Sequence, residues 1–393
     1  MSKPVETWLL PDGVQDVLPA EAHRLEGLRR RLLDHFAAWG YELVFPPLME
    51  YIDSLLSGSG HDLDLMTFKI TDQLSGRLMG VRADITPQVA RLDAHSIPVD
   101  WPARYCYAGT TLNTRQAGLA ASRCPVQLGA ELYGHGGVES DIEILRLMLD
   151  TLKLAGCEGI HLDLGHVGIF GALAKAAGLA KEDESRLFDI FQRKAAAELA
   201  DELPALVPDL RQRHAFEALL RLSGDWRILV DARQAFAAVP GVAPALSVLD
   251  AVAGALSASH PEVTLYFDLS ELRGYHYHTG LVFAAYVNGV RQEVAKGGRY
   301  DHVGEAFGRA RPATGFSTDL KMLLGFAPAS QVPAGIYAPL GDLAELRGAI
   351  ALLRAEGERV VQALPGQAGG ARELGCDREL VSEQGRWVVR SCS

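Results

Sequence analysis

Cysteines are few in this sequence, and no two of them lie close together in the chain. The five residues are Cys106, Cys124, Cys157, Cys376 and Cys392, and no C-x-x-C motif occurs. Zinc sites and the disulfide frameworks of small secreted proteins need closely spaced or paired cysteines. The sequence therefore predicts neither a metal site nor a disulfide framework, and it fits a reducing compartment.

Positive charge is also scarce, since 38 Lys and Arg stand against 49 Asp and Glu, a formal net charge of -11. Proteins that bind nucleic acid generally neutralise phosphates with clustered Lys and Arg. This balance disfavours a general nucleic-acid binder, although a local basic groove stays compatible with it. The N-terminus has no basic stretch before an apolar core, and no segment approaches the ~20 apolar residues of a membrane span. We therefore expect a cytoplasmic protein that does not enter a membrane.

The chain does have length and apolar content, with 393 residues of which 48% are hydrophobic and 22% charged. Such a chain can bury a large core and is long enough for two domains. Residues 20–40 carry Leu and aromatic side chains at helical spacing and predict an amphipathic helix. Residues 67–73 and 77–86 alternate in polarity and predict a hairpin that turns at Gly76, and residues 103–112 and 124–134 predict a second strand pair.

Further along, residues 140–156 predict a helix with Ser140 or Asp141 as its N-cap, followed by a short strand. Residues 169–259 are rich in Ala and Leu and predict an inserted helical subdomain. Strand patterns return before an Asn-Gly hairpin signal at Asn288 and Gly289. Pro328 to Pro333 predicts a linker. We predict an α+β protein with a large domain over residues 1–327 and a small α/β domain over residues 334–393.

The stretch "EVAKGGRYDHVG", residues 293–304, places two glycines before an arginine and a tyrosine. Glycine lets the backbone approach a ligand closely or adopt a positive φ, so the pair shows only that side chains are excluded there. By itself the spacing is more typical of a turn or bulge than of a phosphate cradle or a pocket floor. The remaining motifs must decide among these readings.

Several separated stretches resemble the histidyl enzyme of the class II aminoacyl-tRNA synthetases, in order and in spacing. "PDGVQDVLPAEA" is similar to the opening segment of that family, and "GYELVFPPLME" to motif 1, with Pro47 at its dimer-interface proline. "YAGTTLNTRQAG" with "CPVQLGAELYG" resembles motif 2, and "TGFSTDLKMLL" resembles motif 3. "LRGYHYHTG" and "AKGGRYDHV" resemble the two histidine-specific motifs. The resemblance covers about residues 8–326 and implies an antiparallel sheet with flanking helices.

The resemblance also implies a pocket for histidine, whose ammonium, carboxylate and imidazole each need a partner of matching chemistry. Within "VRADITPQVAR", Asp84 and Thr86 stand where the family holds the ammonium group, and their spacing predicts one strand face. The remaining implied pocket residues are Gln127, Glu131, Arg273, Tyr277, Gly298 and Tyr300. On this reading Gly297 and Gly298 wall a histidine pocket, and no phosphate is involved.

Each of these residues also has an ordinary structural interpretation. Polar residues such as Gln127 and Glu131 are more often solvated strand positions, and Arg273 can be the partner of a structural ion pair. His276 and His278, two apart, could bind a metal from one strand face, but no third and fourth ligand is evident. We therefore expect no metal and no cofactor.

The catalytic cations of the synthetase are missing from this sequence. The arginine of motif 2 is replaced by Asn113, the arginine of motif 3 by Met322, and the small residue of motif 3 by Asp319. An amide and a thioether cannot replace a planar, bidentate cation beside ATP. Losing one preorganised donor costs about 10²–10³ in rate, so the sequence predicts loss of adenylation. The tail after Pro333 contains no lysine and is too short for the anticodon-binding domain, which predicts that the chain does not bind tRNA.

A synthetase body without these parts resembles the ATP phosphoribosyltransferase regulatory subunits, and "YHTGLVFAAY", "GIYAPLGD" and "ERVVQALPGQ" are similar to that family. This resemblance implies a non-catalytic protein of histidine biosynthesis. It further implies homodimers formed through the motif 1 region, a hetero-octamer with a short catalytic chain, and feedback inhibition by L-histidine. Two alternatives stay open: an active or degenerate histidyl-tRNA synthetase, and a stand-alone histidine sensor with another partner.

Overall fold

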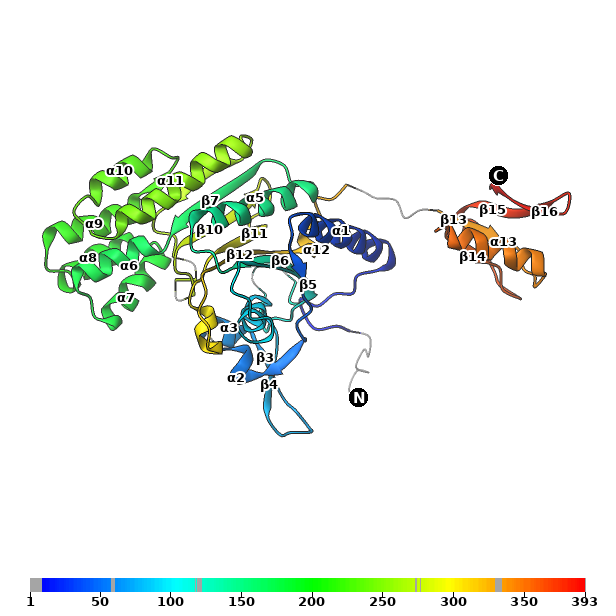
Figure 1. Cartoon of the computed structure of the whole chain (residues 1–393), viewed down its shortest axis with the longest axis horizontal. Coiled ribbons are helices and arrows are strands. Elements are labelled where there is room, and N and C mark those ends of the chain that lie inside the picture. Colours follow the sequence, from blue (N-terminus) through cyan, green and yellow to red (C-terminus); the bar gives the residue numbers. More distant parts are fainter. Residues whose placement is uncertain are drawn as a thin grey trace, which may run out of the picture. The chain divides into compact units, whose positions relative to one another are not determined.

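The computed structural model describes residues 9–57, 61–116, 118, 122–272, 274, 275, 277–328 and 334–392. The chain divides into two compact units, a larger one that ends at Ala327 and a smaller one formed by Pro328–Ser393, with which Pro19–Arg24 are grouped (Figure 1). Most of the predicted linker, residues 329–333, lies outside the described residues.

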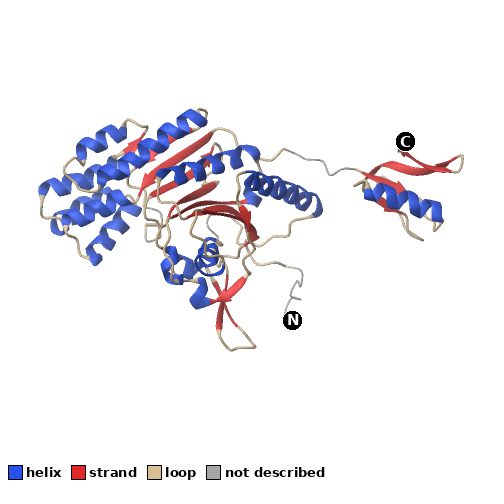
Figure 2. Cartoon of the chain, in the orientation of Figure 1, coloured by secondary structure: helices blue, strands red, loops and turns tan. Residues whose placement is uncertain are grey.

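A mostly antiparallel sheet is the centre of the larger unit (Figure 2). In the described part of the chain its nine strands run in the order β1 (Glu42–Leu43), β5 (Ala103–Thr110), β6 (Val126–Tyr133), β12 (Ala313–Asp319), β11 (Ala295–Arg299), β10 (Leu281–Val287), β7 (Ile160–His166), β9 (Thr264–Asp268) and β8 (Ser223–Gly224). Neighbouring strands are antiparallel except for β1 with β5 and β7 with β9. The predicted pairing of the segments around residues 103–112 and 124–134 is confirmed as β5 with β6.

Two long helices cover one face of this sheet. The predicted N-terminal helix is α1 (Pro19–Ala38), which buries Leu28, Leu32 and Phe36 against the sheet residues Leu128 and Ala130. Beside it, α5 (Val138–Leu154) buries a continuous apolar stripe in the same core. The opposite face of the sheet is therefore left to hold the functional site.

The predicted N-cap of α5 is wrong. The helix begins at Val138 with Gly137 as its N-cap, because the side chains of Ser140 and Asp141 are engaged elsewhere. The Ser140 hydroxyl donates to the Gly137 carbonyl oxygen at 2.7 Å, and the Asp141 carboxylate pairs with Arg299 at 3.0 Å. Arg299 also donates to backbone carbonyls at Gly137 and His135, so it fixes the end of β11 to the start of α5.

A smaller three-stranded sheet has the order β2 (Met49–Tyr51), β4 (Leu78–Val81), β3 (Phe68–Thr71), with α2 (Ile52–Leu55) and α3 (His61–Met66) between β2 and β3. The hairpin predicted at Gly76 is present, and Gly76 has a φ of 71°. The strand predicted to continue to Thr86 is wrong, because β4 ends at Val81 and Thr86 begins the helix α4 (Thr86–Arg91). Pro87 suits the first turn of a helix, where its missing N–H costs nothing. A π-helical turn, η1 (Leu92–Ser96), follows α4 directly.

The predicted insertion is helical, and its helices α6–α11 gather beside the end of the sheet that contains β7, β9 and β8 (Figure 1). They are α6 (Gly168–Ala177), α7 (Lys181–Gln192), α8 (Ala196–Leu206), α9 (Leu210–Arg221), α10 (Ile228–Ala235) and α11 (Val242–Ser259). By length and composition alone α11 is apolar enough to cross a membrane, contrary to the expectation from the sequence. In this structure the apolar face of α11 packs into the core of the larger unit, where it buries Leu246, Leu249, Val252 and Leu256.

The smaller unit contains β13 (Gly335–Ala338), α13 (Ala344–Ala355), β14 (Val360–Gln362), β15 (Cys376–Glu383) and β16 (Arg386–Ser391). Its sheet has the order β14, β13, β15, β16, with β13 parallel to both neighbours and β15 and β16 forming a hairpin. Ile336, Leu346, Ile350, Val360 and Leu380 form its own core. These elements agree with the α/β pattern expected for this segment.

A buried ion pair holds α4 and η1 against the sheet. Arg311 precedes β12, and its guanidinium lies 2.6 Å from the carboxylate of Asp93 in η1, with both side chains less than 10% exposed. Arg311 also donates to the carbonyl oxygen of Trp101 at 2.6 Å. Burial raises the pKa of Asp93, which the positive charge of Arg311 opposes. Removal of Arg311 would leave this carboxylate buried without a cation.

We expect Arg311→Met to lower the free energy of unfolding by about 3–5 kcal/mol, the usual effect of breaking a buried pair. The matched control is Arg309→Met two residues earlier, because Arg309 pairs with the fully exposed Asp100, and exposed pairs contribute at most about 1 kcal/mol. Urea denaturation of both variants at neutral pH measures the difference. Equal losses would show that the Asp93 pair does not anchor η1.

Candidate functional site

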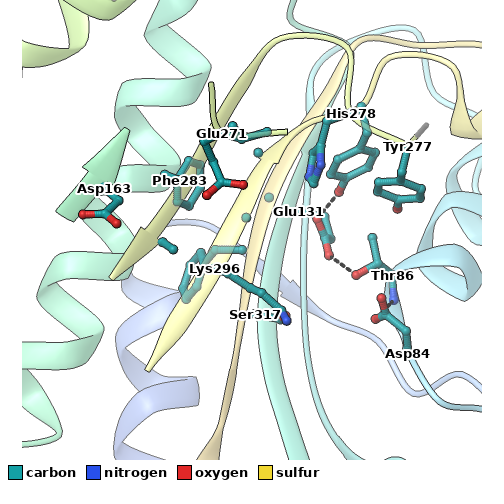
Figure 3. Close-up of a pocket in the computed structure, with 17 residues that line it drawn as sticks. Asp84, Thr86, Glu131, Asp163, Glu271, Tyr277, His278, Phe283, Lys296 and Ser317 are labelled. Atoms are coloured by element: carbon teal, nitrogen blue, oxygen red, sulfur yellow. Dashed lines mark hydrogen bonds between the residues drawn. The ribbon is translucent and has the colours of Figure 1, made fainter. Parts of the chain in front are cut away.

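A cavity of about 170 Å³ lies on the face of the large sheet opposite α1 and α5 (Figure 3). Its lining comes from β6, β7, β10, β11 and β12 and from two connecting segments. The lining residues are Asp84, Thr86, Glu131, Asp163, Glu271, Tyr277, His278, Val282, Phe283, Ala284, Lys296, Gly297, Gly298, Tyr300, Gly315, Phe316 and Ser317. Six of the eight residues proposed for histidine binding therefore surround one cavity.

Glycines keep the floor of this cavity open. Gly315 of β12 is paired with Glu131 of β6, and a Cβ at Gly315 would overlap the Glu131 carboxylate. A Cβ at Gly298 would lie 2.6 Å from the ring of His278, and one at Gly297 would overlap the Gly315 carbonyl oxygen. The glycine pair in "AKGGRYD" thus lies within β11, where Gly298 makes room for His278 and Gly297 for the backbone of β12, and it forms no turn.

Glu131 is the most deeply buried charged group of the cavity, with an exposed fraction of 1%. Its carboxylate accepts hydrogen bonds from Thr86 at 3.0 Å (Figure 3), from Tyr107 at 3.0 Å and from Tyr300. Burial raises the pKa of Glu131 to about 8, against the three hydrogen bonds that favour its ionised form. At neutral pH this group is therefore able both to donate and to accept a proton or hydrogen bond.

Asp84 and Thr86 form the polar end of the cavity, and Gln127 lies behind Asp84. Asp84 lies in the loop after β4, and its Oδ1 accepts hydrogen bonds from the Thr86 backbone N–H at 3.0 Å and the Gln127 side-chain amide at 2.7 Å. The expectation that Asp84 and Thr86 share a strand face is wrong, since Asp84 lies in the loop after β4 and Thr86 is the first residue of the helix α4. Gln127 and Glu131 do share a face of β6, but Gln127 does not line the cavity and acts through Asp84.

The segment 271–278 closes the cavity on another side. Glu271, Tyr277 and His278 line it, while Arg273 and His276 lie outside the described residues. The Tyr277 hydroxyl is buried and has no hydrogen-bond partner among the residues that the structure describes. A buried donor without a partner is costly and is suited to a polar ligand atom. Over the described ranges, no group of three or more His, Cys, Asp or Glu side chains could hold a metal ion.

Four polar residues of the cavity were missed in the sequence: Asp163, Glu271, Lys296 and Ser317. Lys296 faces Ser317 across β11 and β12 and Ala284 across β10 and β11, and Asp163 of β7 is paired with the same Ala284. Alternation within each strand could have suggested that the strand residues among them lie on the cavity face of the sheet. Only the strand order places them side by side on that face.

The two positions expected to be degenerate lie outside the cavity lining. The Asn113 backbone N–H donates to the Arg123 carbonyl oxygen at 2.8 Å, and Arg123 donates back to the Asn113 carbonyl oxygen at 3.0 Å. Met322 lies in the short helix α12 (Leu320–Leu323), where its sulfur is 3.9 Å from the amide of Gln292. Asp319 caps α12, and its carboxylate accepts from the backbone N–H groups of Lys321 and Val126. A negative group therefore occupies the motif 3 region.

Comparison with known proteins agrees with this fold and site. A model of the histidyl-tRNA synthetase family matches residues 13–323, and a model of the ATP phosphoribosyltransferase subunit HisZ C-terminal domain matches residues 333–390. Histidyl-tRNA synthetase from Nostoc superposes with a TM-score of 0.76 over 98% of this chain and 97% of its own, at 15% identity. The larger unit therefore has the fold of class II histidyl-tRNA synthetases, which confirms the predicted fold class.

Full-length relatives define the family more closely. An ATP phosphoribosyltransferase regulatory subunit from Thioalkalivibrio sulfidiphilus is 55% identical over 97% of this chain and 98% of its own, and one from Alkalilimnicola ehrlichii is 55% identical over 98% and 97%. The crystal structure of an ATP phosphoribosyltransferase regulatory subunit/histidyl-tRNA synthetase from Bacillus halodurans C has 27% identity and a TM-score of 0.81, covering 95% of this chain and 97% of its own. The chain belongs to the family of ATP phosphoribosyltransferase regulatory subunits, as its resemblance indicated.

The raised pKa of Glu131 predicts a pH-dependent stability. A folded-state pKa of about 8, above the ordinary value of 4.5, means that the folded protein binds this proton more tightly than the unfolded chain. The stabilisation is complete below pH 4.5 and is lost as the pH rises through 8. Glutamine does not titrate. We therefore expect the free energy of unfolding of Glu131→Gln to fall by a few kcal/mol less than that of the wild type between pH 4.5 and pH 8.

Denaturant titrations of the wild type and Glu131→Gln at several pH values between 5 and 9 provide the test, with Glu139→Gln on the exposed surface of α5 as the control. The difference between wild type and variant isolates Glu131 from histidines that titrate in the same range. Parallel curves for Glu131→Gln and the wild type would contradict the raised pKa.

Proposed function

We propose that this chain is the regulatory, non-catalytic subunit of an ATP phosphoribosyltransferase, which starts histidine biosynthesis in the cytoplasm. It activates a short catalytic chain and inhibits it when L-histidine occupies the cavity around Glu131. Homodimers form through the motif 1 region around Pro47 and join the catalytic chain in a hetero-octamer of equal numbers. A neighbour with 18% identity, from Thermotoga maritima, is described as an ATP phosphoribosyl transferase (HisG:HisZ) complex, which is consistent with such a partnership.

The chemistry of the cavity supports L-histidine as the ligand. An ammonium group needs acceptors, and the Asp84 carboxylate and Thr86 hydroxyl lie together at one end. An imidazole has one ring nitrogen that donates and one that accepts when neutral. Glu131, with its pKa of about 8, and the unpartnered hydroxyl of Tyr277 provide groups of both kinds. This buried arrangement of acid and tyrosines beside a glycine floor is the single observation that carries the proposal.

The exposed face of motif 1 supports the proposed dimer. Leu43, Phe45, Leu48 and Met49 are between 40% and 71% exposed, although they follow one another along β1, β2 and their connection. The carbonyl oxygens of Pro46 and Pro47 accept hydrogen bonds from Arg82 and Gln88, which hold this connection in place. An ordered apolar surface of this kind is typical of protein interfaces.

We propose that synthetase activity is lost, because the residues at the positions that hold ATP in the synthetases carry no positive charge. Adenylation builds negative charge on the phosphates, and preorganised cations are the main means of stabilising it. Asn113 and Met322 provide none, and the buried carboxylate of Asp319 would repel a triphosphate. The smaller unit, without lysine, offers no surface for a polyanion. We therefore propose that the chain neither activates histidine nor binds tRNA.

The first test measures formation of phosphoribosyl-ATP by the short catalytic chain from the same organism, with and without this protein, across a histidine titration. We expect a higher rate when the protein is added and a fall of that rate as histidine increases. No change in rate at any histidine concentration, together with no co-eluting complex, would overturn the proposal and favour a stand-alone histidine sensor. Histidine-dependent ATP–pyrophosphate exchange by the chain alone would instead indicate a synthetase.

Substitution of Glu131 links the cavity to the feedback. We expect Glu131→Ala to leave complex assembly intact and to raise the histidine concentration for half inhibition by about tenfold or more, because hydrogen bonds to charged groups contribute about 1.5–3 kcal/mol. The control is Glu139→Ala, an exposed glutamate of α5, which should leave inhibition unchanged. Unaltered inhibition in Glu131→Ala would place the effector elsewhere.

A further inference from the structure

The segment between β9 and β10, residues 269–280, faces two parts of the larger unit at once. Glu271, Tyr277 and His278 line the cavity (Figure 3). Between them the chain turns tightly at Gly274, which has a φ of 65° and whose carbonyl oxygen accepts from the backbone N–H groups of Tyr277 and His278, both at 2.7 Å. This turn directs the intervening Tyr275 towards the helical insertion.

Tyr275 is bound to the insertion by its ring and by its hydroxyl. Its ring meets Phe170 of α6 edge-on at 5.2 Å and stacks on Phe188 of α7 at 5.3 Å. Its hydroxyl donates to the carboxylate of Glu184 in α7 at 2.6 Å. Aromatic pairs and hydrogen bonds to charged groups each stabilise such a contact beyond simple burial. Phe170 and Phe188 belong to the apolar core of the larger unit, so the ring of Tyr275 is packed against that core.

The start of the same segment is held by the insertion as well. Lys194, between α7 and α8, donates to both carboxylate oxygens of Asp268 at 2.9 and 2.7 Å, and also to the Ser270 hydroxyl. The backbone of β8 pairs with β9 at Asp268, and the Leu269 N–H donates to the Leu222 carbonyl oxygen at 3.1 Å. The insertion therefore contacts the segment on both sides of Glu271.

We infer that the helical insertion sets the affinity of the cavity, with Tyr275 and Glu184 as positioning residues that act through Tyr277 and His278. This inference rests on the proposed function, because it assumes that L-histidine binds in the cavity. It assigns the insertion a regulatory role: any change in the position of α7 changes the geometry of the cavity, and a ligand in the cavity in turn stabilises one position of α7.

Physical reasons favour this coupling over a purely structural contact. The described residues within 269–280 lie in no helix or strand, so their geometry depends on contacts outside the segment. Tyr277 and His278 follow Tyr275 within three residues. Their backbone hydrogen bonds to Gly274 close the turn that contains Tyr275, so the position of Tyr275 affects theirs. Burial raises the pKa of Tyr275, as does its bond to Glu184, so the hydroxyl stays a donor over the physiological pH range.

The test is isothermal titration calorimetry of L-histidine with the full-length protein and two conservative variants. Tyr275→Phe keeps the ring and removes the hydroxyl, and Glu184→Gln removes the charge that accepts its hydrogen bond. We expect each variant to bind histidine about fivefold more weakly, at the low end of usual coupling. The double variant should bind no more weakly than either single one, because both changes remove the same bond.

Two matched controls distinguish positioning from general destabilisation. Tyr266→Phe makes the same change on the exposed face of β9, and Glu198→Gln breaks an exposed ion pair with Arg193 in the same insertion. Both should bind histidine as the wild type does. Unchanged affinity in Tyr275→Phe and Glu184→Gln, with normal binding by the wild type, would overturn this inference alone. Absence of binding by the wild type would instead overturn the proposed function.

Hydrogen exchange tests whether histidine in the cavity in turn stabilises α7. It can also be applied to variants that lose stability. Saturating histidine should slow amide exchange in residues 274–280 and also in α7 of the wild type. In Tyr275→Ala, which removes both ring and hydroxyl, residues 274–280 should respond at higher histidine concentrations and α7 should no longer respond. An equal response of α7 in the wild type and in Tyr275→Ala would contradict a link through Tyr275.

Discussion

The burial of one carboxyl group, that of Glu131, constrains the rest of this structure. A carboxyl group with 1% exposure must find donors within the protein, and it finds them on three separate segments, at Thr86, Tyr107 and Tyr300. The neighbouring strand β12 has no room for a side chain opposite Glu131, and the residue paired with it there is Gly315. The helix α4, the strand β5 and the end of β11 are thus placed with respect to one acid, and the cavity is the space that remains between them.

The elements around this acid are themselves held by charged groups that do not line the cavity. Arg299 joins the end of β11 to the start of α5, and Arg311 joins η1 to the start of β12. Both guanidinium groups are buried, and each satisfies several acceptors on two elements. These pairs explain why a cavity lined by loops and glycines keeps a defined shape. The described residues of the segment 269–280 receive support from the helical insertion, through the bond of Tyr275 to Glu184 and that of Lys194 to Asp268 at the start of the segment.

The relation to the synthetases shows which parts of an active site can be lost separately. Polar residues for an amino acid persist in one cavity, while the positions that would meet the phosphates of ATP carry Asn113, Met322 and Asp319. Recognition of a small zwitterion needs a few buried groups in fixed geometry. Adenylation in addition needs cations that act on the transition state. The first requirement can be met without the second, so under the proposed function this fold binds an amino acid without activating it.

Sequence by itself determined the family, the order of most helices and strands, and six of the residues around the cavity, because motif spacing and periodicity are local properties. It failed at Thr86, where a helix replaces the expected strand, and at the N-cap of α5, because a side chain such as Asp141 serves a distant arginine. Only the tertiary structure decided that Lys296, Ser317 and Asp163 join the cavity and that Tyr275 faces the insertion. Such neighbours depend on strand order and on contacts between segments about 100 residues apart, which no local pattern in the chain encodes.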